Sequence, residues 1–384
     1  MDNSRAISVY QYFQQEFSTE PIVVFSPGRI NLIGEHTDYN DGFAFPAAVD
    51  KGIYMVIGRS NHTHSKAIAM DVSEDYEFFL NNIEPIQNGQ WRNYIIGVVA
   101  EIQKAGLTIP NFNCAFSGDI PVGSGMSSSA ALENSLVFAL NELFKLGLSK
   151  NQMIYISQKA EHNYAGVKCG IMDQYASMFG QENSALLLDC RSVTSDAFEI
   201  DFKDYELMLI NSNVKHALTD TAYNDRRAIC EKISDFLDVS ALRDISIEAL
   251  EKSKKNITAS DYQKVSYVVE EIDRVHQFKE AIATNNLTKI GSLIYASHEG
   301  LSDKYQVSCA ELDFLVDATR DNQHILGARM MGGGFGGCTI NLIHKNGIES
   351  FSKSISSLYR DKFGKDCSMY HVKLSGGTRL IHPK

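Results

Sequence analysis

Short apolar runs alternate with helical repeats along the whole chain, a pattern that predicts a mixed α and β protein. The β-branched run at 22–25 predicts a buried strand that stops at Pro27 and Gly28, where we expect a turn. Comparable runs predict further strands at 52–58, 66–72, 111–116, 184–189, 205–211, 339–343 and 369–374. Apolar residues at helical spacing predict helices at 6–17, 91–106, 127–147, 150–164, 170–180 and 347–363.

Local signals add detail to some of these elements. Ser149 with Gln152 predicts a capping box that opens the helix after it. The stretch 217–227 leads into another helix, and 240–322 is charged and helical without clustered chemistry, so we interpret it as scaffold. The last helix and strand are expected to close a β-α-β unit, as in a ferredoxin-like domain.

Length and composition indicate a soluble globular protein. A chain of 384 residues exceeds what one hydrophobic core usually serves, so we expect two domains, at 1–195 and 196–384. Hydrophobic residues make up 44% and charged residues 22%, and no apolar run approaches the roughly 20 residues that span a bilayer. The opening residues lack the pattern of a signal peptide, so we expect a cytoplasmic protein with no membrane partner.

Charge and cysteine placement narrow the function classes. The formal net charge is −11, with no basic tail or Lys/Arg block, which disfavours nucleic acid as a partner. An anionic substrate such as ATP then has to be held locally, by helix N-termini, glycine-loop amides and a metal ion. The seven cysteines are scattered without a C-x-x-C pair, so we expect reduced thiols rather than disulfides or a zinc site.

The stretch from Pro27 to Pro46 carries more functional side chains than any other segment. Its polar residues are Arg29, Asn31, Glu35, His36, Asp38, Tyr39, Asn40 and Asp41. Such side chains donate and accept hydrogen bonds around a polyhydroxyl ligand, and an arginine faces an anion or a carboxylate. We therefore predict that this loop lines a polar pocket, although Asn40-Asp41-Gly42 alone is typical of an ordinary turn.

Residues 117–133 predict an anion site formed by a strand, a glycine loop and a helix start. Free amides and the positive end of the helix dipole face the loop, and the serines at 127–129 add hydroxyl donors or a metal ligand. A Walker A loop is excluded because no lysine stands here. A dinucleotide fingerprint is disfavoured because no acidic residue ends a second strand about 20 residues further on.

Other candidates each allow a plainer interpretation. Asp173 falls in the first turn of a predicted helix, where any carboxylate is favoured electrostatically. Trp91, the only tryptophan, either stacks on a base or packs in the core. Tyr223 either reaches a ligand or lies on a solvated helix surface. The glycine-rich stretch 328–342 permits close backbone approach to a ligand or a tight strand crossing.

Taken together, these stretches resemble the GHMP small-molecule kinases, and within them the galactokinases. PGRINLIGEHTDYNDG is similar to the galactokinase signature, PVGSGMSSSAALE to the ATP loop of the family, and MMGGGFGGCTI to its third glycine motif. Segments 160–177 and 221–227 also match galactokinase patterns. The chain departs from the common pattern at Ile30, Asp41 and Met126, and none of these departures removes a functional side chain.

The resemblance implies an α+β fold of two domains with the active site between them. The N-terminal domain would be like ribosomal protein S5 domain 2, and the C-terminal one ferredoxin-like. Arg29 and Asp173 would be catalytic and flank the anomeric hydroxyl of galactose. The sugar would be bound by Glu35, His36, Thr37, Asp38, Gly170 and Tyr223. The nucleotide would be bound by Trp91, Gly123, Ser124, Gly125, Met126, Ser127, Ser128 and Ser129, and Mg²⁺ by Glu161 with Ser129 or Ser128.

The implied reaction transfers the γ-phosphoryl group of MgATP to the 1-hydroxyl of α-D-galactose, in a monomeric protein. Asp173 would orient the hydroxyl and accept its proton, while Arg29 and Mg²⁺ would stabilise the transferring group. Two alternatives stay open. One is a related kinase acting on N-acetylgalactosamine or another pyranose, and the other is a catalytically silent sensor of sugar and ATP. The intact set of Arg29, Asp173, Glu161 and the serines at 127–129 argues against the sensor.

Overall fold

The largest sheet of this computed structural model, which describes residues 3–215 and 219–382, has six strands in the order β13-β1-β3-β6-β4-β5. Neighbouring strands pair antiparallel except β4 and β6, which pair parallel. The strands are β1 (Ile22–Asn31), β3 (Pro46–Arg59), β4 (Ser65–Ala69), β5 (Glu74–Phe78), β6 (Phe112–Gly118) and β13 (Arg379–Ile381).

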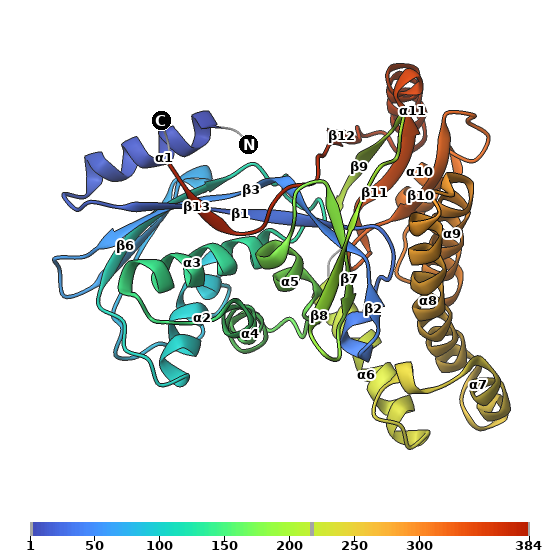
Figure 1. Ribbon diagram of the computed structural model, residues 1–384, viewed down its shortest axis with the longest axis horizontal. Coiled ribbons are helices and arrows are strands. Elements are labelled where there is room, and N and C mark those ends of the chain that lie inside the picture. The colour runs from blue at the N-terminus through green and yellow to red at the C-terminus, as the bar shows by residue number, and fades with distance from the viewer. Residues whose placement is uncertain (1–2, 216–218, 383–384) are drawn as a thin grey trace.

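Helices cover both faces of this sheet (Figure 1). One helix lies on the first face, where Val9 and Phe13 are fully buried against Val56 and its neighbours. The opposite face carries a larger apolar core beneath four helices. The helices are α1 (Asn3–Glu16) on the first face, and α2 (Trp91–Lys104), α3 (Ser128–Phe144), α4 (Lys150–Ala160) and α5 (Met172–Phe179) on the second. The capping box of Ser149 and Gln152 at the start of α4 is confirmed.

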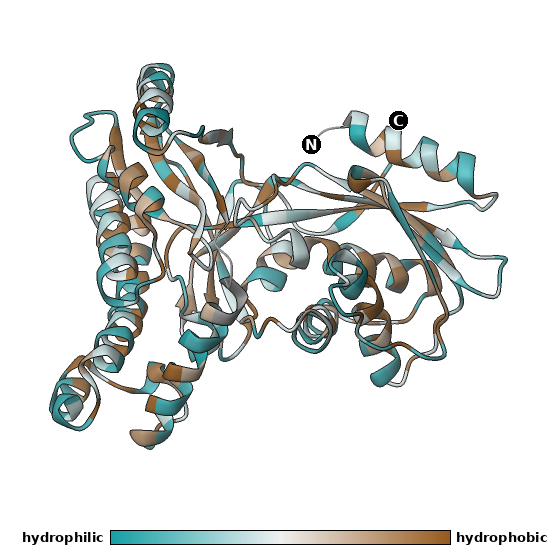
Figure 2. Cartoon of the chain, turned by 180° about the vertical axis from the view of Figure 1, so that it is seen from behind, coloured by the Kyte–Doolittle hydropathy of each residue, from teal (hydrophilic) through white to brown (hydrophobic). Residues whose placement is uncertain are grey.

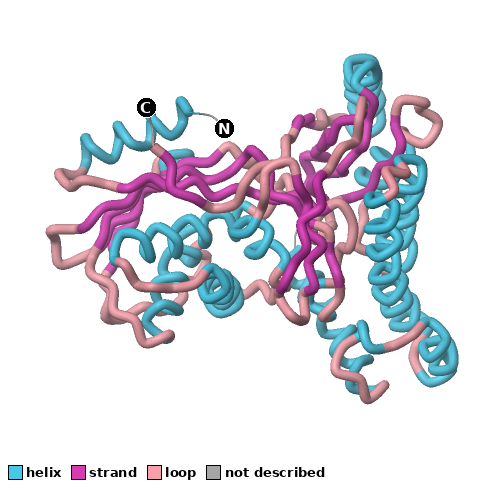
Figure 3. Tube along the Cα trace, in the orientation of Figure 1, coloured by secondary structure: helices cyan, strands magenta, loops and turns pink. Residues whose placement is uncertain are grey.

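Two smaller sheets and a second group of helices form the rest of the molecule (Figure 3). The sheets have the orders β10-β11-β9-β12 and β2-β7-β8. Their strands are β2 (Phe43–Ala44), β7 (Ser184–Asp189), β8 (Thr194–Glu199), β9 (Tyr205–Lys215), β10 (Ile325–Met330), β11 (Gly336–His344) and β12 (Ser368–His371). The helices are α6 (Thr219–Phe236), α7 (Ile247–Ser253), α8 (Ala259–Ala283), α9 (Leu287–Glu299), α10 (Ala310–Asp317) and α11 (Ile348–Phe363). Figure 2 shows hydrophilic stretches along the outer helices.

The turn expected at Pro27 and Gly28 is wrong, because β1 continues through both residues to Asn31. The register between β1 and β3 shifts between Pro27 and Arg29, which marks a β-bulge, where a proline is tolerated. Gly28 suits the position, since a Cβ there would lie 2.6 Å from the carbonyl oxygen of Met126. The bulge therefore brings β1 against the glycine loop, and the amide of Arg29 donates to that same carbonyl at 3.1 Å.

In two other predicted elements the backbone changes type before the expected end. The helix predicted at 150–164 is α-helical only to Ala160 and continues as a π turn at Glu161–Ala165. The strand predicted at 66–72 ends at Ala69 and passes into a 3₁₀ turn, Met70–Val72. Residues 217 and 218 of the predicted helical stretch at 217–227 lie outside the described residues, and α6 begins at Thr219.

The end of the chain returns to the largest sheet, since β13 pairs with β1 through Arg379, Leu380 and Ile381. The division at residue 195 stays a prediction. Within the described ranges, no helix combines the length and apolar character needed to cross a membrane.

Candidate active site

The loop that follows β1 is folded tightly enough to fix its polar side chains. Gly34 and His36 have positive φ values of 93° and 63°, in the left-handed region that permits tight turns. The amide of Gly34 donates to the buried carboxylate of Glu271 in α8 at 2.9 Å. The Asn40 side chain donates to the carbonyl oxygen of His36 at 2.9 Å. The loop is therefore closed on itself and anchored to α8.

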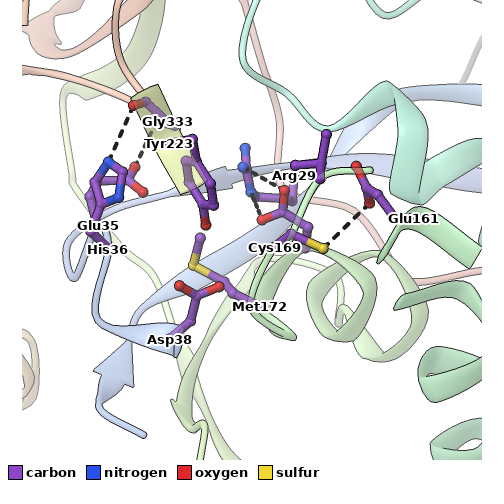
Figure 4. A pocket seen from close by; sticks show the side chains of 12 residues that line it. Arg29, Glu35, His36, Asp38, Glu161, Cys169, Met172, Tyr223 and Gly333 are labelled. Carbon is purple, nitrogen blue, oxygen red and sulfur yellow. Dashed lines mark hydrogen bonds and ion pairs between the residues drawn. The ribbon is translucent and has the colours of Figure 1, made fainter. Parts of the chain in front are cut away.

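Arg29, labelled in Figure 4, forms a two-pronged ion pair with Asp173 in the pocket. Nε and Nη2 of Arg29 donate to the two carboxylate oxygens of Asp173 at 2.8 and 2.9 Å. Ser127 also donates to Asp173, and Nη1 of Arg29 donates to the carbonyl oxygen of Gly125. β1, the first turn of α5 and the glycine loop thus meet at one carboxylate.

A polar pocket surrounds this pair, and most of the residues predicted to bind sugar line it. Its walls come from the loop after β1, from α5 and α6, from the π turn and from the third glycine stretch. The lining residues are Arg29, Glu35, His36, Asp38, Glu161, Val167, Cys169, Met172, Asp173, Tyr223, Gly332 and Gly333. Both predicted segments, 1–195 and 196–384, contribute to these walls.

Thr37 and Gly170, also predicted as sugar contacts, are not among the lining residues. The hydroxyl of Thr37 is fully buried and donates to the carbonyl oxygen of Phe43 at 2.7 Å, so it closes the loop. A Cβ at Gly170 would lie 1.9 Å from Oδ2 of Asp38. Gly170 therefore acts on the pocket by leaving room for the Asp38 carboxyl.

Burial shifts the pKa values of three pocket residues. It raises the pKa of Asp38 to about 7, with a further rise from the charge of Asp173. The same two causes raise the pKa of Glu161 to about 7. Burial lowers the pKa of His36 to about 3, so this ring is neutral at physiological pH. Its Nε2 then donates to the carbonyl oxygen of Gly333 at 3.2 Å, and its Nδ1 accepts from the Tyr39 hydroxyl at 2.7 Å.

A buried ion pair behind the pocket was missed by sequence reasoning. Arg329 is 0% exposed, and its Nη1 and Nη2 each lie 3.2 Å from Oε1 of Glu35. The same oxygen accepts from the amide of Gly332 at 2.9 Å. Arg329 is the second residue of the glycine-rich stretch 328–342, but nothing local in the sequence distinguishes it from an ordinary strand residue. Its role follows only from the contact between β10 and the loop after β1.

A second cavity lies along the glycine loop, whose residues Gly125, Ser127 and Ser129 contact residues of the first pocket. It is lined by Ile53, Ala69, Asp71, Val72, Trp91, Phe116, Gly118 and residues 120–129. All eight residues predicted to bind nucleotide are among them. The hydroxyl of Ser124 is buried and has no hydrogen-bond partner among the described residues. An uncompensated donor beside free helix amides suits a phosphate oxygen.

The two predicted metal-binding serines differ in their surroundings. Ser129 donates to Oε1 of Glu161 at 2.9 Å, whereas Ser128 is exposed at the start of α3. Gln174 donates to the other oxygen of Glu161 at 2.9 Å. Close by, Glu133 is fully buried and its two carboxyl oxygens have no hydrogen-bond partner among the described residues. Ser129 and Glu161 supply oxygen atoms of the kind that Mg²⁺ prefers, and among the described residues no group of three or more His, Cys, Asp or Glu side chains is arranged to hold a metal ion.

Comparison with known proteins assigns the chain to a family. The models "GHMP kinases N terminal domain" and "GHMP kinases C terminal" match residues 93–181 and 278–361, and the galactokinase galactose-binding signature matches residues 11–59. A galactokinase of Thermotoga maritima is 37% identical over 360 residues, which cover 93% of this chain and 99% of that protein. The chain belongs to the galactokinase family.

Further members of the galactokinase family agree in sequence and in structure. A galactokinase of Thermosipho africanus is 38% identical over 365 residues, covering 93% of this chain and 99% of the relative. The crystal structure of Lactococcus lactis galactokinase complexed with galactose matches with a TM-score of 0.93 and 33% identity, over 98% of this chain and 99% of that one. Methanococcus jannaschii mevalonate kinase, 17% identical over 93% of this chain and 99% of its own, shares the fold with a TM-score of 0.67. The expected two-domain α+β GHMP kinase fold is confirmed, and the chain is an ATP-dependent sugar kinase.

Proposed function

We propose that this member of the galactokinase family transfers the γ-phosphoryl group of ATP to the 1-hydroxyl of α-D-galactose. The observation that carries the proposal is the Arg29–Asp173 pair, which lies where the polar loop after β1 meets the glycine loop. A sugar hydroxyl in the polar pocket and a phosphate at the glycine loop would both lie beside this pair. Galactose as the acceptor is supported by the name of the relatives and by the sugar in the Lactococcus lactis complex.

Each group at the centre has a distinct role in this proposal. Asp173 accepts the proton of the 1-hydroxyl, and its orientation is fixed by the two donors of Arg29. Arg29, a permanent cation, offsets the negative charge that gathers on the transferring phosphoryl group. Glu35, Asp38 and Tyr223 offer acceptors and a hydroxyl to the remaining sugar hydroxyls. Phosphoryl transfer passes through a loose transition state, so positioning and charge neutralisation carry most of the catalysis.

Mg²⁺ completes the proposed site. Ser129 and Glu161 would hold it, because a hydroxyl and a carboxylate oxygen lie together at the start of α3. When bound there, Mg²⁺ would supply positive charge against the phosphates of ATP. The chain's own part is to keep Glu161 in place through the donors of Ser129 and Gln174. The proposal also includes a monomeric state and a cytoplasmic location.

The test is ADP release by the purified protein with MgATP and a panel of acceptors. The panel contains galactose, N-acetylgalactosamine, glucose, arabinose, mevalonate and a blank without acceptor. Strong turnover with galactose supports the proposal. If the protein prefers another acceptor, it is a kinase whose substrate is that acceptor rather than galactose. If it binds galactose without turnover, it is a sensor.

A further inference from the structure

The indole of Trp91 is held from three directions at the edge of the second cavity. Its N–H donates to Oε2 of Glu74 in β5 at 2.8 Å. The ring of Phe116 meets it edge-on, with centroids 5.5 Å apart. The guanidinium of Arg92 lies over the ring, 5.1 Å from its centroid. A tryptophan at the first residue of a helix normally has rotameric freedom, and these contacts remove it.

Glu74 contacts both the indole and the guanidinium that covers it. The oxygen that accepts the indole N–H also accepts from Nη2 of Arg92 at 3.0 Å. The carboxylate thus fixes the edge of the indole and places the cation that covers one of its faces. Arg92 does not line the second cavity, whereas Trp91 and Phe116 do. Arg92 therefore lies against a part of the indole that is not the part bordering the cavity.

An indole that lines the same cavity as the glycine loop is suited to contact a flat heterocycle. Stacking of a base on an aromatic ring is favourable, and it depends on the orientation of the ring. A ring held in one orientation before binding loses no rotamer freedom when the base arrives. The orientation of Trp91 is thus a determinant of nucleotide affinity, and Glu74 sets it from outside the cavity lining.

We propose that Glu74 is a positioning residue for the nucleotide: together with Arg92 it holds Trp91 in the orientation in which the indole lines the cavity and contacts the base of ATP. The inference rests on the proposed function in one respect, namely that a nucleotide occupies the second cavity. Glu74 touches neither the reacting atoms nor the glycine loop, so it affects the binding of ATP and not the chemical step.

The electrostatic setting argues against a mainly structural role. The side chains of Glu74 and Arg92 are 41% and 28% exposed, and ion pairs this close to solvent contribute little to folding. Removing the carboxylate therefore leaves the fold intact and frees the indole. Loss of the Glu74 carboxylate should therefore weaken ATP binding more than it lowers the free energy of unfolding.

The experiment compares Glu74→Ala and Glu74→Gln with the matched control Glu77→Ala. Glu77 lies on the same strand and its carboxylate faces Lys66 at 3.6 Å, away from the indole. We expect Glu74→Ala to raise the KM for ATP about fivefold to tenfold, with kcat and the KM for galactose unchanged. Glu74→Gln keeps an acceptor oxygen for the indole N–H and should restore most of the loss, and Glu77→Ala should resemble the parent protein.

Fluorescence gives a readout that a merely structural role would not move. Trp91 is the only tryptophan of the chain, so its emission reports this one ring. We expect lower emission anisotropy in Glu74→Ala than in the parent protein, and weaker quenching at a given ADP concentration. An unchanged KM for ATP with unchanged anisotropy overturns the proposal, as does an equal effect of Glu77→Ala. If the parent protein does not turn over galactose but ADP quenching still depends on Glu74, the proposed function fails and this inference stands.

Discussion

At the scale of single residues, the site depends on how one carboxylate is held. Asp173 accepts from Arg29 at both oxygens and from Ser127 as well. These donors leave little freedom for the carboxylate to rotate away from a sugar hydroxyl. The Asp173 carboxylate therefore both orients the sugar hydroxyl and accepts its proton. For catalysis its negative charge should matter more than its size.

Asp173→Asn separates charge from size. The amide keeps the shape and one acceptor oxygen, but it takes up no proton and does not pair with Arg29. We expect kcat to fall by roughly 10²–10⁴-fold with a smaller change in the KM for galactose. Asp189→Asn is the control, because Asp189 also pairs with an arginine, at 2.6 Å from Arg243, and lies outside the pocket lining. A near-normal kcat in Asp173→Asn would remove Asp173 as an essential proton acceptor.

Glu161 should make the metal-free protein less stable at high pH. Its folded-state pKa of about 7 lies above the ordinary value of 4.5, so the folded state resists its ionisation. The penalty is absent below about pH 4.5 and grows as the pH rises to about 7. Glu161→Gln removes this penalty. In EDTA at pH 8, the free energy of unfolding of the variant should therefore be higher than that of the parent protein by up to about 3 kcal/mol. Urea unfolding at pH 5 and pH 8 measures the difference, which should be small at pH 5.

The same variant tests the metal site by a separate readout. Glu161→Gln should need more Mg²⁺ for half-maximal turnover at pH 8, because an amide oxygen is a weaker ligand than a carboxylate. If Glu161→Gln and the parent protein differed in stability by the same amount at pH 5 and pH 8, the raised pKa of Glu161 would be contradicted. An unchanged Mg²⁺ requirement would exclude Glu161 as a ligand.

At the scale of elements, the start and end of α4 have different tasks. Ser149 and Gln152 form a reciprocal cap that starts the helix with ordinary geometry. At the other end the helix passes into a π turn beginning at Glu161. π turns inside helices are frequent at functional sites because the extra residue redirects side chains. Here the turn coincides with the residue that faces Ser129 and the pocket.

Ser149→Ala should affect stability and leave function alone. Loss of an N-cap hydroxyl costs about 1 kcal/mol, and the cap lies at the end of α4 opposite to Glu161. We expect a lower midpoint in urea with kcat and both KM values unchanged. A change in the KM for galactose or ATP would mean that the position of α4 is coupled to the site more tightly than its packing indicates.

Local motifs explain which parts of the site could be predicted from the sequence. Arg29, Glu35 and Asp38 share one short segment, and Ser127–Ser129 share one helix start, so their grouping needs no knowledge of the fold. The bulge at Pro27 and Gly28 could not be foreseen, because the pairing of β1 with β3 overrides the usual turn preference of this dipeptide. The π turn at 161–165 likewise has no local signal that separates it from a helix end.

At the scale of the whole molecule, a contact between distant segments completes the pocket. Glu35 and Arg329 are 294 positions apart, and both are almost fully buried. Arg329 also donates to the carbonyl oxygen of Leu32 at 3.0 Å. β10 thereby fixes the loop after β1 against the third glycine stretch. No sequence pattern predicts this pair, since its partners meet only when both sheets have formed.

Arg329→Met should show how much the fold depends on this contact. Methionine keeps most of the volume but leaves the Glu35 charge buried and unpaired, which typically costs about 3–5 kcal/mol. Lys345→Met removes a surface pair, whose partner Asp204 lies 3.5 Å away, and should change the free energy of unfolding by less than about 1 kcal/mol. Urea unfolding of both variants measures the contrast. Equal small effects would mean that Glu35 is neutral or solvated in the absence of Arg329.

The most direct test of the account is the structure of the product. Incubation of the parent protein with MgATP and galactose, followed by proton and phosphorus NMR, locates the phosphate on the sugar. The account predicts a phosphate on C1 of the α anomer, formed by the parent protein and lost in Asp173→Asn. A phosphate on another carbon, or the same product formed equally fast by Asp173→Asn, would contradict it.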